Sequence, residues 1–150
     1  QKKGVKKNFG ISMNIPAEMQ ASKKAKNFIW ISNNASSGMK NLILMKVKRE
    51  ERRGKANSDA FPAQEKQQID SMLRTNMPGE TDSMYMIIPV LSEKGLWEMK
   101  GDAMGGPYVM RRIRLRKTGD EIIIIGFVYA PEMKKKILIK QLEAAISTIK

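Results

Sequence analysis

The chain has 150 residues, 41% of them hydrophobic, and its 28 Lys and Arg residues against 15 Asp and Glu residues give a formal net charge of +13. This length fits one domain of ordinary size that can bury a core of its own. The absence of cysteine and histidine excludes disulfides, thiol nucleophiles, histidine-based triads and the commonest metal ligands from this segment.

The first third of the chain predicts three strands. Residues 1–8 are basic and are expected to fray. Residues 9–15 alternate between apolar and small or polar side chains, which is typical of a half-buried strand, and Pro16 stops it. Apolar runs predict two further strands over residues 28–32 and 42–48, and one face of the second becomes basic towards its end.

A helix is expected after a charge-dense linker over residues 46–55. Ser58 or Asp59 can cap it, and Pro62 suits the first turn, where its missing N–H costs nothing. Apolar residues follow a helical repeat over residues 61–77, and the Pro-Gly pair at 78–79 ends it.

The second half of the chain predicts four more strands. Residues 84–91 form one of them, and Pro89 inside it argues for an edge or a bulge. An antiparallel meander follows, with a first turn at Gly105-Gly106 and a second at residues 118–120, and its strands are 96–100, 108–116 and 121–129.

The last strand and the last helix should pack together. Residues 121–129 are apolar on both faces, so this strand is expected at the centre of the sheet with layers above and below it. Residues 132–149 form an amphipathic helix that should bury Leu142 and Ile146 against that strand. The fold class is therefore α+β, a single domain over residues 9–150 with a mainly antiparallel sheet of about six or seven strands and helices on its faces.

Several strings carry a resemblance across nearly the whole chain: FGISMNIP (9–16), NFIWISN (27–33), MPGETDSMYM (77–86), GLWEMKGDAMGGPY (95–108), GFVYAP (126–131) and QLEAAI (141–146). With these strings the chain resembles the C-terminal half of an uncharacterised family of Bacteroides-type lipoproteins, the domain of unknown function DUF4837. It departs from the family pattern at residues 46–60, where a basic stretch replaces an aromatic and proline-bearing one.

The resemblance implies an upstream half, a lipidated N-terminus and a place in the bacterial cell envelope, as a periplasmic or outer-membrane lipoprotein, but no known activity. The element order is more loosely similar to the fold shared by PsbP and Mog1, an α/β/α sandwich. Fold similarity of this kind does not assign a function.

Two candidate surfaces stand out. The tip between the strands at 96–100 and 108–116 combines aromatic, methionine, acidic and glycine residues, and loops on rigid sheets often carry recognition. Its candidate partner-binding residues are Trp97, Asp102, Met104, Gly105, Gly106 and Tyr108.

The second surface is basic. A row of arginines on one strand, together with the basic linker, could hold a polyanion. The residues of this surface are Lys46, Lys48, Arg49, Arg52, Arg53, Arg112, Arg114 and Arg116.

A catalytic pair is not evident in the sequence. Glu98 and Asp102 would share a strand face but lie roughly 13 Å apart, beyond the reach of a glycosidase pair. The lack of a catalytic pair favours a non-catalytic module without a cofactor, which binds a protein or a glycan. The resemblance implies that this module lies in the cell envelope and meets the membrane only through an upstream lipid anchor. Two alternatives stay open: a domain that binds nucleic acid or another polyanion, and a hydrolase that uses carboxylates and lysines alone.

Overall fold

The computed structural model describes residues 15, 19, 21–33, 39–48, 63–77, 85–89, 91–100, 105–115, 120–129 and 132–148. The predicted lead-in at 1–8 lies outside these residues. So do the predicted strand at 9–15 except for its last residue, and the predicted helix cap at Ser58 or Asp59.

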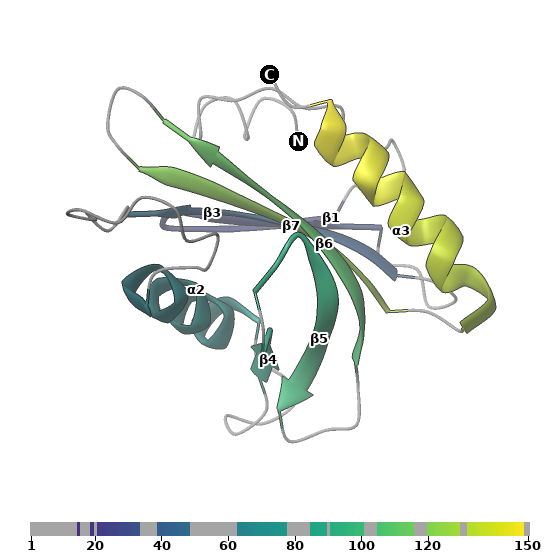
Figure 1. Cartoon of the computed structure of the whole chain (residues 1–150), viewed down its shortest axis with the longest axis horizontal. Coiled ribbons are helices and arrows are strands. Elements are labelled where there is room, and N and C mark those ends of the chain that lie inside the picture. The colour runs from purple at the N-terminus through teal and green to yellow at the C-terminus, as the bar shows by residue number, and fades with distance from the viewer. Residues whose placement is uncertain are drawn as a thin grey trace.

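In the part of the chain that the structure describes, a single seven-stranded sheet, antiparallel at every pairing, runs in the order β1-β2-β3-β7-β6-β5-β4. Helices α2 and α3 lie on opposite sides of it (Figure 1). The elements in chain order are β1 (Ala21–Ala25), β2 (Phe28–Ser32), β3 (Met39–Val47), α2 (Ala63–Asn76), β4 (Tyr85–Ile87), β5 (Lys94–Lys100), β6 (Gly105–Arg114), β7 (Glu121–Tyr129) and α3 (Glu132–Ser147). The prediction of an α+β fold with a mainly antiparallel sheet is confirmed.

Strand β7 occupies the middle position of the sheet, as its doubly apolar sequence predicted. Alternate residues of β7 belong to two separate apolar clusters. The face that carries Ile122 and Ile124 packs against α3, and we call it the α3 face. The face that carries Ile123 and Ile125 packs against α2, and we call it the α2 face.

Helix α3 lies close to the sheet because β7 has a glycine beneath it. Leu142 is fully buried and Ile146 nearly so, which confirms the predicted packing. A Cβ atom on Gly126 would stand only 3.0 Å from Leu142 Cβ and 3.3 Å from Ile146 Cδ1. A side chain larger than a methyl group at this position would therefore push the helix away from the strand.

Helix α2 is held to the sheet by its buried face and by a hydrogen bond at its C-terminal end. Ile69 and Leu73 are fully buried on the α2 face of the sheet. At the C-terminal end of the helix, Lys23 Nζ of β1 donates a hydrogen bond of 3.1 Å to the carbonyl oxygen of Asn76. A cation at this end satisfies one of the last carbonyls and opposes the negative end of the helix dipole.

The strands at both edges of the sheet are short. Strand β1 is polar and exposed along most of its length, and the sequence patterns above do not identify it. A tight turn joins it to β2, and Asn27 in that turn has φ 57°, a conformation that Asn tolerates better than most residues. The three-residue β4 forms the other edge, which confirms the edge position expected for the strand predicted over residues 84–91. The strand ends before Pro89, so that proline lies just beyond it and not inside it as predicted.

The predicted turn at Gly105-Gly106 is wrong. Both glycines lie in β6, where Gly105 pairs with Glu98 and Gly106 pairs with Trp97. The glycines serve close packing instead, because a Cβ on Gly105 would stand 2.8 Å from the carbonyl oxygen of Trp97. A Cβ on Gly106 would overlap the carbonyl oxygen of Val128.

Candidate functional site

The predicted partner-binding tip is only partly described by the structure. Asp102 and Met104 lie outside the described residues. Tyr108 is a core residue, 1% exposed, and its hydroxyl accepts a hydrogen bond of 3.0 Å from the backbone N–H of Ser92. Trp97 is also buried, at 2% exposure. Neither ring is therefore presented on an exposed tip, and partner binding at this end of the sheet stays a prediction.

The structure divides the described residues of the predicted basic surface between the two faces of the sheet, with Arg112 and Arg114 of the predicted arginine row together on the α2 face. Lys46 pairs with Ile122 on the α3 face, whereas Arg112 pairs with Ile123 on the α2 face. Directly paired residues share a face, so these two side chains emerge on opposite sides. Arg112 Nε lies 4.0 Å from Glu121 Oε2, as expected for a strand face that balances its own charge.

The other predicted basic residues add little to that picture. Lys48 lies just beyond the end of β3, and Arg114 is the last residue of β6. Arg49, Arg52, Arg53 and Arg116 lie outside the described residues. Polyanion binding stays a prediction.

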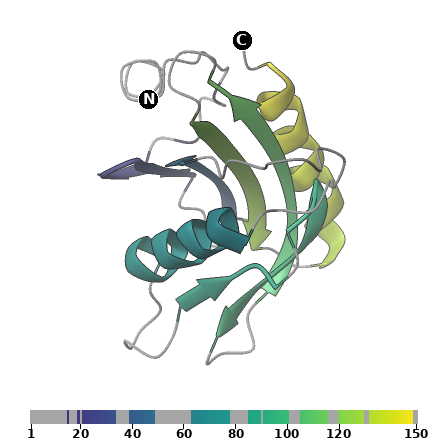
Figure 2. The same ribbon diagram turned by 60° about the vertical axis from the view of Figure 1, so that its left-hand side comes forward.

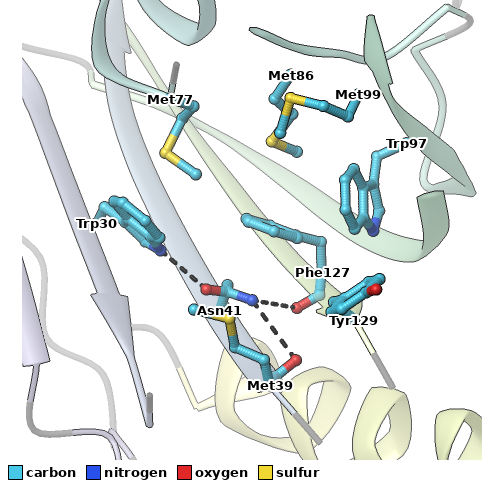
Figure 3. A pocket seen from close by; sticks show the side chains of 9 residues that line it. All are labelled: Trp30, Met39, Asn41, Met77, Met86, Trp97, Met99, Phe127 and Tyr129. Carbon is cyan, nitrogen blue, oxygen red and sulfur yellow. Dashed lines mark hydrogen bonds between the residues drawn. The ribbon is translucent and has the colours of Figure 1, made fainter. Parts of the chain in front are cut away.

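A pocket that the sequence did not predict lies on the α2 face (Figure 3). Its volume is about 140 Å³, and its lining is almost entirely apolar. Residues from five strands and the residue directly after α2 line it: Trp30, Met39, Asn41, Met77, Met86, Trp97, Met99, Phe127 and Tyr129. The curled sheet carries β4 round towards α2 (Figure 2), and this curvature brings the methionines of β4 and β5 to the same pocket as the end of the helix.

Three aromatic rings form one wall of the pocket. The ring centroids of Trp97 and Phe127 are 5.3 Å apart at 66°, and those of Trp97 and Tyr129 are 6.4 Å apart at 64°. Both arrangements are edge-to-face, which is the favoured geometry for aromatic pairs. Trp97 Nε1 donates a hydrogen bond of 3.1 Å to the carbonyl oxygen of Val128, which fixes the indole in place.

The buried side-chain amide of Asn41 forms part of the pocket lining. Asn41 is 1% exposed, and its Oδ1 accepts a hydrogen bond of 2.9 Å from Trp30 Nε1. Its Nδ2 donates towards the carbonyl oxygens of Phe127 and Met39, at 3.4 and 3.5 Å (Figure 3). The amide thus joins β2, β3 and β7, and its polar atoms are engaged inside the protein.

Four methionines supply much of the remaining lining. Met77 and Met86 are buried, and Met39 and Met99 are half-buried. Methionine side chains are flexible and polarizable, so such a lining can adapt to an incoming group. Tyr129 lines the pocket and is 45% exposed, so the pocket borders solvent at this residue.

The pocket could have been suspected from composition but not located by it. Twelve methionines in 150 residues is a high count, and sequence analysis interprets them as core filler. Only Trp97 among the lining residues belongs to the candidate partner-binding set. The other eight are separated along the chain and meet only through the sheet register.

A cationic cluster surrounds Tyr85 on the edge strand β4. Arg74 Cζ lies 4.7 Å from the centre of its ring and Lys100 Nζ lies 5.3 Å from it. A hydrogen bond with Lys100, followed by the charges of Lys100 and Arg74, lowers the pKa of Tyr85 below its ordinary value of 10.0.

Two features are absent from the part of the chain that the structure describes. There, no three His, Cys, Asp or Glu side chains gather as a metal-ligand set. Neither of the helices α2 and α3 is long and apolar enough to cross a membrane.

Comparison with known proteins assigns the family. The family model described as "Domain of unknown function (DUF4837)" matches residues 1–148. No curated protein and no solved structure matches the chain. The match covers almost all of the sequence, and the chain therefore belongs to the DUF4837 family.

Proposed function

We propose that this domain is a non-catalytic binding module of the bacterial cell envelope, and that the pocket on the α2 face receives an apolar group of its protein or glycan partner. The observation that carries the proposal is the pocket itself, with its volume of about 140 Å³ and its lining of methionine and aromatic residues. Concave, mostly apolar sites of this kind are the usual places where proteins bind ligands.

The envelope location has separate support. Resemblance to Bacteroides-type lipoproteins favours a lipid anchor upstream of this segment, and membrane contact through that anchor alone. The arrangement of one sheet between two helices supports the similarity to the fold of PsbP and Mog1, which stays a prediction.

Site-specific photocrosslinking in cells tests the proposal. The full-length protein is expressed in its own host with the photoreactive residue p-benzoylphenylalanine at position 129, at the pocket, or at position 137, on α3. Tyr129 and Ile137 are both well exposed, at 45% and 62%, but the helix lies on the opposite side of the sheet from the pocket. We expect a defined crosslinked envelope partner from position 129 and none from position 137.

The same cells test the location. We expect the full-length protein in the envelope fraction after cell disruption. Equal crosslinking from both positions, no crosslinking from position 129, or a protein recovered wholly in the cytosolic fraction would contradict the proposal. Crosslinking that persists when a cell lysate is irradiated at high salt would separate this function from polyanion binding, because a complex held by phosphate contacts weakens steeply with salt before the covalent bond forms.

A further inference from the structure

We infer that the pocket on the α2 face accepts one uncharged aromatic ring, carried at the end of a larger ligand whose remainder stays outside. This inference rests on the proposed function and names the chemistry that the site selects. Three features support it: the volume of the pocket, its aromatic and methionine lining, and the hydrogen bonds that its polar atoms already make within the protein.

The size of the pocket fits a single ring. Its volume is about 140 Å³, and a dry apolar cavity of about 150 Å³ in another protein holds one benzene molecule. Tyr129 lines the pocket and is 45% exposed, so a group inside can remain joined to a body in solvent. A fused system of several rings would exceed the available space.

The walls favour an aromatic ring over an alkyl group of similar size. Trp97 already contacts Phe127 and Tyr129 edge-to-face, and a ligand ring can extend this arrangement. Thioether sulfurs also make favourable contacts with ring edges. Met77, Met86 and Met99 lie around one side of the pocket, where a ring would meet them (Figure 3).

The polar atoms of the lining exclude sugars and charged groups from the interior. Both indole N–H groups donate within the protein, Trp30 to Asn41 and Trp97 to Val128. The side-chain amide of Asn41 accepts a hydrogen bond from Trp30 and donates to two backbone carbonyls. Sugar hydroxyls placed here would lose their water partners without enough replacements, which is unfavourable.

Methionine methyl groups provide the assay. The protein is labelled with ¹³C at its methionine methyls, each signal is assigned by a Met→Leu substitution, and toluene is added. We expect saturable, ring-current shifts at the methyls of Met39, Met77, Met86 and Met99. Met19, in the cluster on the α3 face, and Met110, in the same cluster as the pocket but not lining it, are internal controls and should stay unmoved.

Competing probes test the ligand class. Methylcyclohexane should bind about fivefold more weakly than toluene, since it lacks the edge-to-face and sulfur contacts. Methyl glucoside should shift none of the pocket methyls. N-acetylphenylalanine amide should shift the same methyls as toluene while N-acetylalanine amide should not, because the ring enters and the amide backbone stays outside.

Substitutions test the location. Met99→Trp fills part of the pocket from a half-buried position and should weaken toluene binding about tenfold, whereas Met110→Leu should leave it within about twofold. If Met99→Trp fails to fold, Tyr129→Ala offers a second test at an exposed position and should also weaken binding.

Several results would overturn the inference. These are the absence of saturable shifts, equal affinity for methylcyclohexane, shifts with methyl glucoside, and binding of toluene without binding of the phenylalanine amide. Silver ion that shifts the pocket methyls while toluene does not would assign the pocket to a soft metal instead. If toluene does not bind but position 129 crosslinks to a partner, the preference for an aromatic ring is rejected and the proposed binding module is kept. If toluene binds but position 129 gives no crosslink, only the proposed binding module is rejected.

Discussion

Replacement of Gly106 by alanine tests why β6 begins with two glycines. A Cβ at this position would overlap the carbonyl oxygen of Val128 and stand 3.1 Å from Trp97 Nε1. These two atoms are joined by the hydrogen bond that fixes the Trp97 indole. The backbone of Gly106 is not in the left-handed region, so close packing and not conformation demands a glycine there.

The expected cost can be worked from these contacts. Forcing the strands apart to admit one methyl group costs about 1–3 kcal/mol. Stretching the bond between Trp97 and Val128 leaves a buried donor poorly satisfied, at about 1–3 kcal/mol. A gain of about 0.4–1 kcal/mol from reduced freedom in the unfolded chain offsets part of this. We therefore expect Gly106→Ala to lower the free energy of unfolding by about 3 kcal/mol, and the melting temperature by about 6–12 °C.

The matched control is Gly126→Ala. The new Cβ would meet Leu142 and Ile146 side-chain atoms of α3 at 3.0–3.4 Å. Side chains on a helix can shift by a few tenths of an ångström, whereas the backbone of Val128 is held in the sheet by its pairing with Lys40. This variant should lose about 1 kcal/mol, toward the low end of the range for added core volume.

Urea unfolding followed by tryptophan fluorescence measures both variants against the wild type. Trp97→Phe, which has no Nε1–H, provides the background for a double-mutant cycle with Gly106→Ala. In that background the alanine should cost about 1 kcal/mol less, because the hydrogen bond is already gone. Equal stability of the Gly106→Ala and Gly126→Ala variants, or a cycle with no coupling, would refute the reasoning.

Three further substitutions probe other parts of the structure. Leu142→Ala should lower the free energy of unfolding by about 2–5 kcal/mol in urea, because it empties a fully buried position between α3 and the sheet. Asn41→Ala should cost about 1–3 kcal/mol in thermal unfolding, because Trp30 Nε1–H loses its acceptor at 2.9 Å. Lys100→Met should raise the pKa of Tyr85 in an ultraviolet titration of tyrosinate, since the hydrogen bond and charge of Lys100 lower it. As the pKa of Tyr85 is lower in the folded chain, its ionisation stabilises the fold fully only above the unfolded value of 10.0, and this contribution is lost as the pH falls through the folded pKa.

Controls accompany each of these. Ile137→Ala, at 62% exposure on the same helix as Leu142, should change stability by no more than about 0.5 kcal/mol. Trp30→Phe should remove most of the cost of Asn41→Ala, and Tyr85→Phe should remove the early step from the titration. A Leu142→Ala variant as stable as Ile137→Ala, an Asn41→Ala cost unaffected by Trp30, or an unchanged titration in Lys100→Met would each count against the corresponding contact.

Local patterns predicted the elements with strong apolar periodicity. The doubly apolar run at 121–129 required cover on both faces, and β7 lies in the middle of the sheet between α2 and α3. Apolar residues at helical spacing identified α3, and Leu142 and Ile146 are buried as that spacing implied. In both cases the apolar residues of the segment had to be buried, and this requirement alone was enough to predict where the segment packs.

Other features depended on neighbours that no local pattern reveals. Glycines at 105 and 106 suit a turn as well as a close strand contact, and only the approach of Val128 and Trp97 decides between them. Strand β1 is polar because an edge strand needs only backbone bonds to β2, so its residues carry no apolar alternation.

What the sequence by itself determined is the fold class, the central strand and the family, because these follow from apolar periodicity and from strings that run along the chain. The tertiary structure alone decided that Tyr108 is a core residue, that the described basic side chains divide between two faces, and that a methionine and aromatic pocket exists. The physical reason is that sheet register and curvature set which side chains meet. Trp30 and Tyr129 lie far apart in the sequence. Strands β2, β3 and β7 are nevertheless neighbours in the sheet and bring both rings to one pocket.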